Sequence, residues 1–151
     1  MTAAARLKGL GLTLPTPPKP VASYIPLVCS GNLVFVSGIV PHVEGKPMAG
    51  GLTGKDVTVE QANAAAKQAA LLALSILDAN GLLEKVRRVV RVTGYVASSP
   101  GFTDQPKVLN GASDLLVAVF GEAGKHARSA VGVAALPLNS AIEVEFLFEV
   151  A

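Results

Sequence analysis

Two charged residues near the C-terminal end of the sequence have types and a spacing that suit a small anion. Arg128 stands at the head of a run of small residues, and Glu143 follows fifteen positions later inside an alternating run. An arginine side chain is always charged and can bind a carboxylate through two parallel hydrogen bonds. The pair is therefore the first candidate for a functional site.

Period-two alternation places these residues on defined strand faces. Side chains two positions apart in a strand share a face. In the last strand the acidic face carries Glu143, Glu145 and Glu149, and the apolar face carries Ile142, Val144, Phe146, Phe148 and Val150. In the run before it, Arg128 shares its face with Ala130, Gly132 and Ala134. That face has little bulk and leaves room for a small anion. Spacing alone also allows a surface arginine and a solvated acidic face.

Length and composition predict one domain that associates with copies of itself. The chain has 151 residues, half of them apolar and 16% charged. This length allows one ordinary domain with a core. A mean hydropathy of +0.48 is high for a soluble monomer, so we expect apolar surface to be buried between subunits. The most apolar segment, residues 69–77, is about half the ~20 residues that span a membrane. We expect a buried helix there and no membrane anchor.

Several classes of cofactor and partner are not expected. A single cysteine, Cys29, cannot form an internal disulfide, and His42 and His126 lack the spacing of metal ligands. No metal or organic cofactor is predicted. The net charge of +2 is too small for the electrostatic footprint of a nucleic-acid binder. The N-terminus has no continuous hydrophobic stretch typical of an export signal, which favours a cytoplasmic protein.

The local patterns predict helices and strands in the order β-β-α-β-α-β-β. Helices are expected over 2–10, 58–77 and 103–120, with Thr58 and Gln61 forming a capping box and Thr103 capping the last helix. Strands are expected over 23–30, 33–38, 86–97, 128–135 and 141–150. The first two would form a hairpin with Pro26 at the sheet edge. Residues 13–20 contain four prolines and should be extended, and residues 41–55 form a loop. Read alone, the last two strands would make a simple hairpin.

Three other motifs favour structural readings. The segment AGGLTGKD lacks the first glycine and the Ser or Thr of a phosphate-binding loop, because Ala49 and Asp56 stand there. The basic run around Arg88 divides its charges between two strand faces, which is typical of a solvated edge. No feature near Cys29 would activate its thiol.

The C-terminal pattern resembles the signature of the YjgF/RidA family, the reactive intermediate deaminases. The pattern runs Ala-Arg-Ser, small residues, Leu136-Pro137 and Ile-Glu-Val-Glu, with Arg128 and Glu143 at the family's spacing. Four further residues resemble positions of the family site: Tyr24, Ser37, Gly38 and Asn110. Two positions depart from well-studied deaminases, with Ala130 in place of a cysteine and Ile39 in place of a glutamine. The resemblance covers roughly residues 21–150 and is closest to a longer, less characterised branch.

The resemblance implies a chorismate-mutase-like α+β fold, with two helices on one face of a mixed sheet and a strand between the last two. The whole chain would be a single domain with residues 1–20 as an N-terminal appendage. The expected assembly is a homotrimer with clefts shared between subunits. The resemblance implies that Arg128 and Glu143 are catalytic, and that Tyr24, Ser37, Gly38, Asn110 and Ala130 line the substrate site.

The implied activity is hydrolysis of small 2-imino acids to 2-keto acids and ammonia. Arg128 would anchor the substrate carboxylate and Glu143 would orient water, with no cofactor. A non-catalytic binder or sensor of small carboxylates could use the same cleft. An endoribonuclease or translation inhibitor ranks last, because the chain shows neither a basic field nor stacking aromatics.

Overall fold

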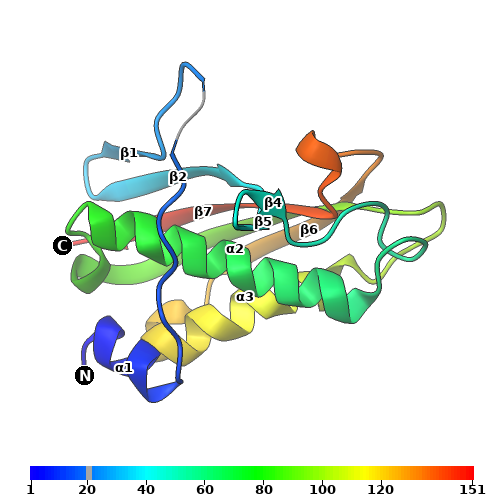
Figure 1. Cartoon of the computed structure of the whole chain (residues 1–151). Helices are drawn as coiled ribbons and strands as arrows, with labels where there is room; N and C mark the ends of the chain where they lie inside the picture. The colour runs from blue at the N-terminus through cyan, green and yellow to red at the C-terminus, as the bar shows by residue number, and fades with distance from the viewer. Residues whose placement is uncertain (20–21) are drawn as a thin grey trace.

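Five strands form one mixed sheet, and two long helices cover one of its faces (Figure 1). The computed structural model describes residues 1–19 and 22–151. The sheet has the strand order β1-β2-β7-β5-β6, with β5 parallel to β6 and the other neighbours antiparallel. The strands are β1 Leu27–Ser30, β2 Leu33–Ile39, β5 Val86–Ala97, β6 Ala127–Val133 and β7 Ile142–Val150.

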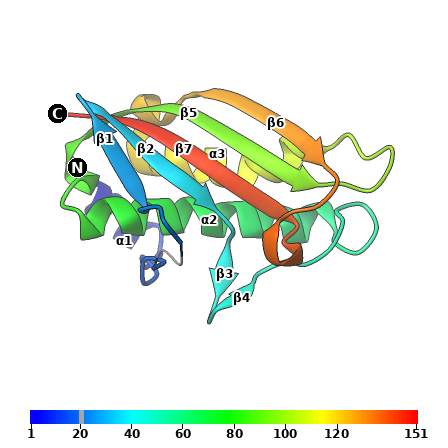
Figure 2. The same cartoon turned by 90° about the horizontal axis from the view of Figure 1, so that it is seen from above.

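Besides the five-stranded sheet, the described residues form three α-helices, three short 3-10 turns and one small hairpin. The α-helices are α1 Ala3–Gly9, α2 Val59–Ala79 and α3 Gln105–Phe120. The 3-10 turns are η1 Leu83–Lys85, η2 Gly121–Gly124 and η3 Pro137–Asn139. Strands β3 His42–Val43 and β4 Lys46–Pro47 pair as a hairpin that projects from the end of β2 (Figure 2). No helix among residues 1–19 and 22–151 is long and apolar enough to cross a membrane.

Helix α2 begins at the capping box that the sequence predicts. The Thr58 hydroxyl accepts from the Gln61 backbone amide, and the Gln61 side chain accepts from the Thr58 amide. These two bonds satisfy amides that the first helical turn would leave unpaired. The buried side of α2 is rich in alanine, which lets α3 pack closely against it. The helix layer is therefore thin and tightly packed.

We predict that Gly111→Ala destabilises this helix pair. A Cβ at Gly111 would overlap the backbone carbonyl of Asn63 on α2, and a backbone atom cannot move aside as a flexible side chain can. The helices would have to separate, so we expect a loss of about 1–3 kcal/mol in the free energy of unfolding. Urea denaturation measures it. Gly9→Ala, which meets no atom within 4 Å, is the matched control. Equal stabilities of the two variants would contradict close helix packing.

The two sheet faces differ in what covers them. The side chains under the helices are buried, and they include Val92, Ile142 and Phe148. On the opposite face Val28, Phe35 and Val131 are 51%, 48% and 44% exposed. Apolar side chains therefore lie open on the side that no helix covers.

The N-terminal segment packs on the domain. Thr2 caps α1 as predicted, and both carboxylate oxygens of Glu84 accept backbone amides from Ala3 and Ala4 at 2.9 Å. After α1 the chain passes across α2 toward β1 (Figure 1). Pro20, the last residue of the proline-rich segment, and Val21 lie outside the described residues.

The element predictions were right in kind and wrong at some boundaries. The α+β class, the β1–β2 hairpin and the edge position of β1 are confirmed. Strand β5 lies between β6 and β7, so the simple hairpin is wrong and the arrangement implied by the family resemblance is confirmed. Asp104, not Thr103, precedes α3, and β1 starts at Leu27 instead of residue 23. The predicted loop 41–55 contains the β3–β4 hairpin, which is too short to give a clear alternating pattern.

Candidate functional site

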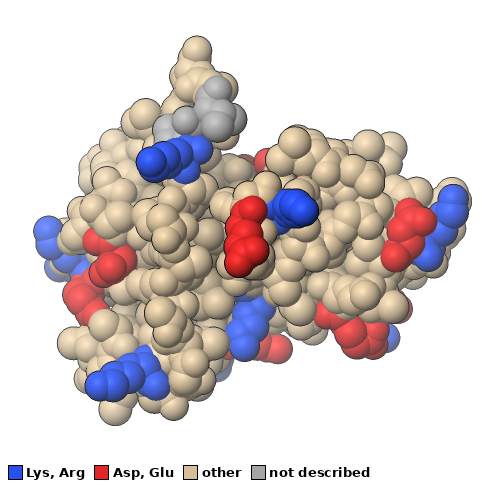
Figure 3. Space-filling model, in the orientation of Figure 1, with Lys and Arg blue, Asp and Glu red and all other residues tan. Residues whose placement is uncertain are grey.

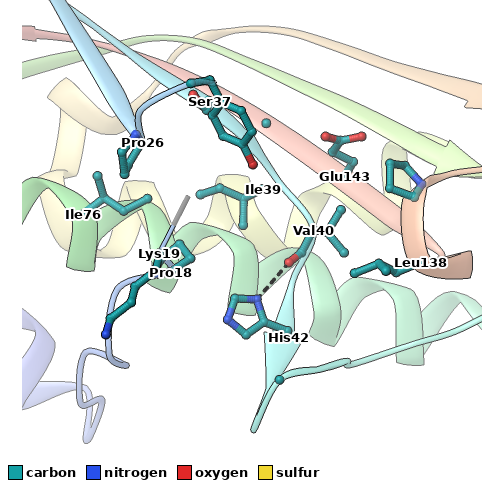
Figure 4. Close-up of a pocket in the computed structure, with 14 residues that line it drawn as sticks. Pro18, Lys19, Pro26, Ser37, Ile39, Val40, His42, Ile76, Leu138 and Glu143 are labelled. Carbon is teal, nitrogen blue, oxygen red and sulfur yellow. Dashed lines mark hydrogen bonds between the residues drawn. The ribbon is translucent and has the colours of Figure 1, made fainter. Parts of the chain in front are cut away.

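A pocket of about 500 Å³ opens at one end of β2 and β7, bounded by the N-terminal segment and η3 (Figure 4). Its walls are mostly apolar, with Ile39 from β2, Ile76 from α2 and Leu138 from η3 among them. Leu138 is 76% exposed and holds a left-handed backbone with φ of 57°. A pocket with apolar walls and few polar groups is typical of a small-molecule site.

A bulge in β2 forms the polar side of this pocket. The pairing between β2 and β7 shifts register between Val36 and Ile39, which places Ser37 and Gly38 in the bulge. The Ser37 hydroxyl donates to the Ile25 carbonyl at 2.7 Å, and its amide donates to the Pro26 carbonyl at 2.9 Å. These bonds hold the segment before β1 against β2. Bulges commonly re-aim groups next to active sites, and here Tyr24 and Gly38 both line the pocket.

Glu143 supplies the carboxylate of the pocket. It lies near the start of β7, on the face away from the helices, and its side chain reaches the backbone of Gly38. Partial burial raises the pKa of Glu143 above its ordinary value, and the negative charge of Glu145 raises it further. A carboxylate with a raised pKa in an apolar pocket can act as a proton acceptor.

Arg128 lies outside this pocket. It sits on the edge strand β6, level with the buried Val92, and so points to the helix side of the sheet. Its Nη1 donates to the Asn110 side-chain oxygen at 2.7 Å and to the Ser113 hydroxyl at 3.2 Å. Among the described residues no carboxylate forms a salt bridge with this guanidinium. Its charge is therefore held by neutral partners and stays available to an anion.

The seven predicted site residues divide into two groups. Tyr24, Ser37, Gly38 and Glu143 line the pocket. Asn110, Arg128 and Ala130 lie together at the β6 edge beside α3 and do not line it. Glu143 is level with Tyr95 on β5, whereas Arg128 is level with Val92, three residues away. Three residues correspond to about 10 Å along the strands, and the two side chains also point to opposite faces.

Several residues beyond the seven predicted ones complete these two groups. Ile76 and His42 contribute to the pocket wall, and no pattern in their segments pointed to this role. Pro137 and Leu138 also line the pocket, and the Leu136-Pro137 motif was an available signal for them. Ser113 contacts Arg128 and lies three residues after Asn110, which places both on one side of α3.

The chain matches a known family over nearly its whole length. The family model described as "YjgF/chorismate mutase-like, putative endoribonuclease" matches residues 4–150. The match starts well before residue 21, where the resemblance noted from the sequence begins. Protein TCP17 from Trypanosoma cruzi is 46% identical over 97% of this chain and 92% of its own length.

Solved structures have the same fold. Protein Atu1372 from Agrobacterium tumefaciens, of unknown function, is 45% identical with a TM-score of 0.89, covering 99% of this chain and 92% of its own. A "putative endoribonuclease" from Shewanella oneidensis is 34% identical with a TM-score of 0.94, and the match covers 99% of this chain and 100% of its own. RidA from an Antarctic Psychrobacter is 25% identical with a TM-score of 0.58, and the match covers 89% of this chain and 94% of its own. With the family model matching residues 4–150 and relatives that share its mixed sheet and helix pair, this chain belongs to the YjgF/RidA family.

Proposed function

We propose that the protein is a hydrolytic deaminase of 2-imino acids whose sites are shared between subunits of a homotrimer. The observation that carries the proposal is the separation of two complementary groups. A carboxylate with a raised pKa lies in an apolar pocket, and a guanidinium without an acidic partner lies on an edge strand facing the other way. One chain cannot bring both to one small ligand. A second copy can complete the site if its β6 edge lies against the pocket.

The open sheet face supports association. It carries the exposed side chains of Val28, Phe35 and Val131, which a neighbouring subunit would remove from water. In a closed ring each subunit makes the same contact with its neighbour, so no subunit is left with an open interface. Association through this face would therefore bury apolar surface and complete three identical clefts.

The chemistry needs few groups. Water attacks the C=N carbon of the imino acid, the nitrogen gains a proton, and the carbinolamine then releases ammonia to leave the 2-keto acid. Arg128 would hold the substrate carboxylate by two parallel hydrogen bonds, which fixes its orientation as well as its charge. Glu143 would take the proton from water and return it to the nitrogen. Tyr24 and the Ser37–Gly38 bulge would complete the wall around the reacting carbon.

The direct test follows imine loss. An amino-acid oxidase generates 2-imino acids, and semicarbazide traps whatever is not hydrolysed. We expect the wild-type protein to lower the yield of trapped imine in proportion to its concentration. No effect on trapping with any amino acid would reject the deaminase and leave the carboxylate binder, which saturable keto-acid binding would then support.

Gly38→Ala is expected to lower turnover with little effect on stability. A Cβ at Gly38 would lie 2.6 Å from the Glu143 carboxylate oxygen and 3.3 Å from its carboxyl carbon. The end of a flexible side chain can move away, so the fold tolerates the methyl group while the carboxylate leaves its place. We expect kcat to fall by about 10- to 100-fold with an unchanged melting temperature. Wild-type kcat in this variant would contradict the placement of Glu143.

The pH profile should report the ionisation of Glu143. A proton acceptor works only as the carboxylate, so kcat should fall as pH drops through its raised pKa. Glu145→Gln removes one cause of the raised pKa and leaves burial in place, so the acidic limb should move to lower pH. The wild type and the Glu145→Gln variant both contain Arg128, so this residue does not cause any difference between their pH profiles. An unmoved acidic limb would exclude coupling between the two carboxylates.

Other activities have less support. The face shown in Figure 3 has basic and acidic side chains interspersed, without a continuous basic surface for RNA. RNA cleavage that is lost in Arg128→Ala would nonetheless favour an endoribonuclease. We propose the cytoplasm as the site of action.

A further inference from the structure

A chain of hydrogen bonds connects Arg128 through Ser113 to His126. The Ser113 hydroxyl lies 3.2 Å from Arg128 Nη1 and 2.9 Å from His126 Nε2. The other ring nitrogen of His126, Nδ1, lies 2.6 Å from the Gly124 carbonyl oxygen. All four side chains in this group, including Asn110, are partly buried. The group joins α3, η2 and β6 at the edge of the sheet.

The direction of each hydrogen bond follows from the chemistry of its ends. The Gly124 carbonyl can only accept, so Nδ1 of His126 carries the proton. In the neutral ring Nε2 then accepts, and the Ser113 hydroxyl must donate to it. This leaves the Ser113 oxygen lone pairs facing Arg128, which can only donate. The Asn110 atom facing Arg128 must likewise be its oxygen.

The arrangement restrains one arm of the guanidinium. The hydrogen bonds to Asn110 and Ser113 both use Nη1, while Nη2 and Nε have no hydrogen-bond partner among the described residues. A guanidinium carries five N–H donors in a rigid plane, so holding one nitrogen orients the other two. Two parallel donors on one edge of that plane match the two oxygens of a carboxylate.

We propose that His126 and Ser113 are positioning residues for carboxylate recognition by Arg128. His126 holds the Ser113 hydroxyl with its hydrogen turned away from the arginine, and Ser113 together with Asn110 holds Nη1. The free edge of Arg128 then faces the substrate carboxylate. This inference rests on the proposed function only in taking a carboxylate as the ligand.

The test compares four variants by binding and by turnover. Calorimetry measures the affinity for a 2-keto acid, the reaction product, and the imine assay gives KM and kcat. We expect Ser113→Ala and His126→Leu each to weaken keto-acid binding and raise KM by about fivefold, as for one lost hydrogen bond. The values of kcat should change little. Both variants should hydrolyse an imine that has no carboxylate at the wild-type rate.

Two variants serve as controls. His126→Gln keeps an oxygen that can accept from Ser113, so it should retain most of the affinity. Ser129→Ala removes a hydroxyl from the opposite face of the same strand, where it contacts Arg91, and should bind like the wild type. A merely structural role would lower the melting temperature without this pattern in KM.

The outcomes separate this inference from the proposed function. Unchanged affinity in both Ser113→Ala and His126→Leu, or an equal loss in Ser129→Ala, would overturn the positioning role. Keto-acid binding that follows the expected pattern without imine hydrolysis would uphold it and reject the deaminase. A wild-type protein that binds no keto acid would overturn both.

Discussion

Arg128→Ala is expected to lower kcat/KM for 2-imino acids by at least about a hundredfold, the usual result of losing one partner of a desolvated charge pair. In the proposed reaction the guanidinium anchors the substrate carboxylate, and neither Asn110 nor Ser113 carries a charge that could replace it. Loss of the side chain should leave the sheet intact because Arg128 is on an edge strand. Semicarbazide trapping measures the activity, and analytical ultracentrifugation checks the assembly.

Arg87→Ala is the matched control, because Arg87 is an exposed arginine near the start of β5 and belongs to neither half of the site. It should retain wild-type activity. Normal turnover by Arg128→Ala with an intact assembly would reject the anchor and, with it, the proposed reaction.

The Arg128 variant also tests whether the cleft is shared. Glu143→Gln and Arg128→Ala subunits, each inactive alone, should regain activity when they are unfolded and refolded together in equal amounts. In a mixed trimer of either composition, one of the three clefts takes Arg128 and Glu143 from intact donors. Random assembly therefore predicts about a quarter of wild-type activity for a cyclic trimer. A site contained within one subunit would give no recovery.

Glu143→Gln is expected to lower kcat by about 10²–10⁴-fold, the range for loss of a general base. Glutamine keeps the shape of the side chain and one acceptor oxygen, but it cannot accept the proton from water. Keto-acid binding should survive, because the anchor is a different residue. The imine assay gives kcat, and calorimetry gives the affinity.

Glu149→Gln is the matched control for this substitution. Glu149 lies on the same face of β7 but accepts from Asn32 near the far end of the strand, away from the pocket. It should leave kcat unchanged. A Glu143→Gln variant with wild-type kcat would show that another group activates the water.

Much of the fold could be predicted from local sequence patterns. The capping box at Thr58, the alternation from Ile142 to Val150 and the small residues after Arg128 each depend on neighbours close in the chain. Such signals determine the kind of element and the face on which each side chain lies. They predict Arg128 and Glu143 as candidates and place both in strands. They predict the boundaries of elements less well. The residue before α3, for example, is Asp104 and not the predicted Thr103.

Spatial relations between distant segments required the tertiary structure. Strand β5 lies between β6 and β7 and keeps Arg128 apart from Glu143, and the register of each strand with β5 places the two side chains on opposite faces. The bulge at Ser37–Gly38 arises from pairing with β7, more than a hundred residues later in the chain, and no local pattern specifies it. The contact of His126 with Ser113 likewise joins the segment between η2 and β6 to α3.

The sequence by itself determined which residues could do chemistry, because residue type and period-two alternation are local properties. Only the tertiary structure decided that these residues form two separate groups in the folded chain. The reason is that strand order and register are set by burying the apolar faces of β2, β5 and β7 together under α2 and α3. That packing places the guanidinium of Arg128 and the carboxylate of Glu143 out of reach of one small ligand within a single chain.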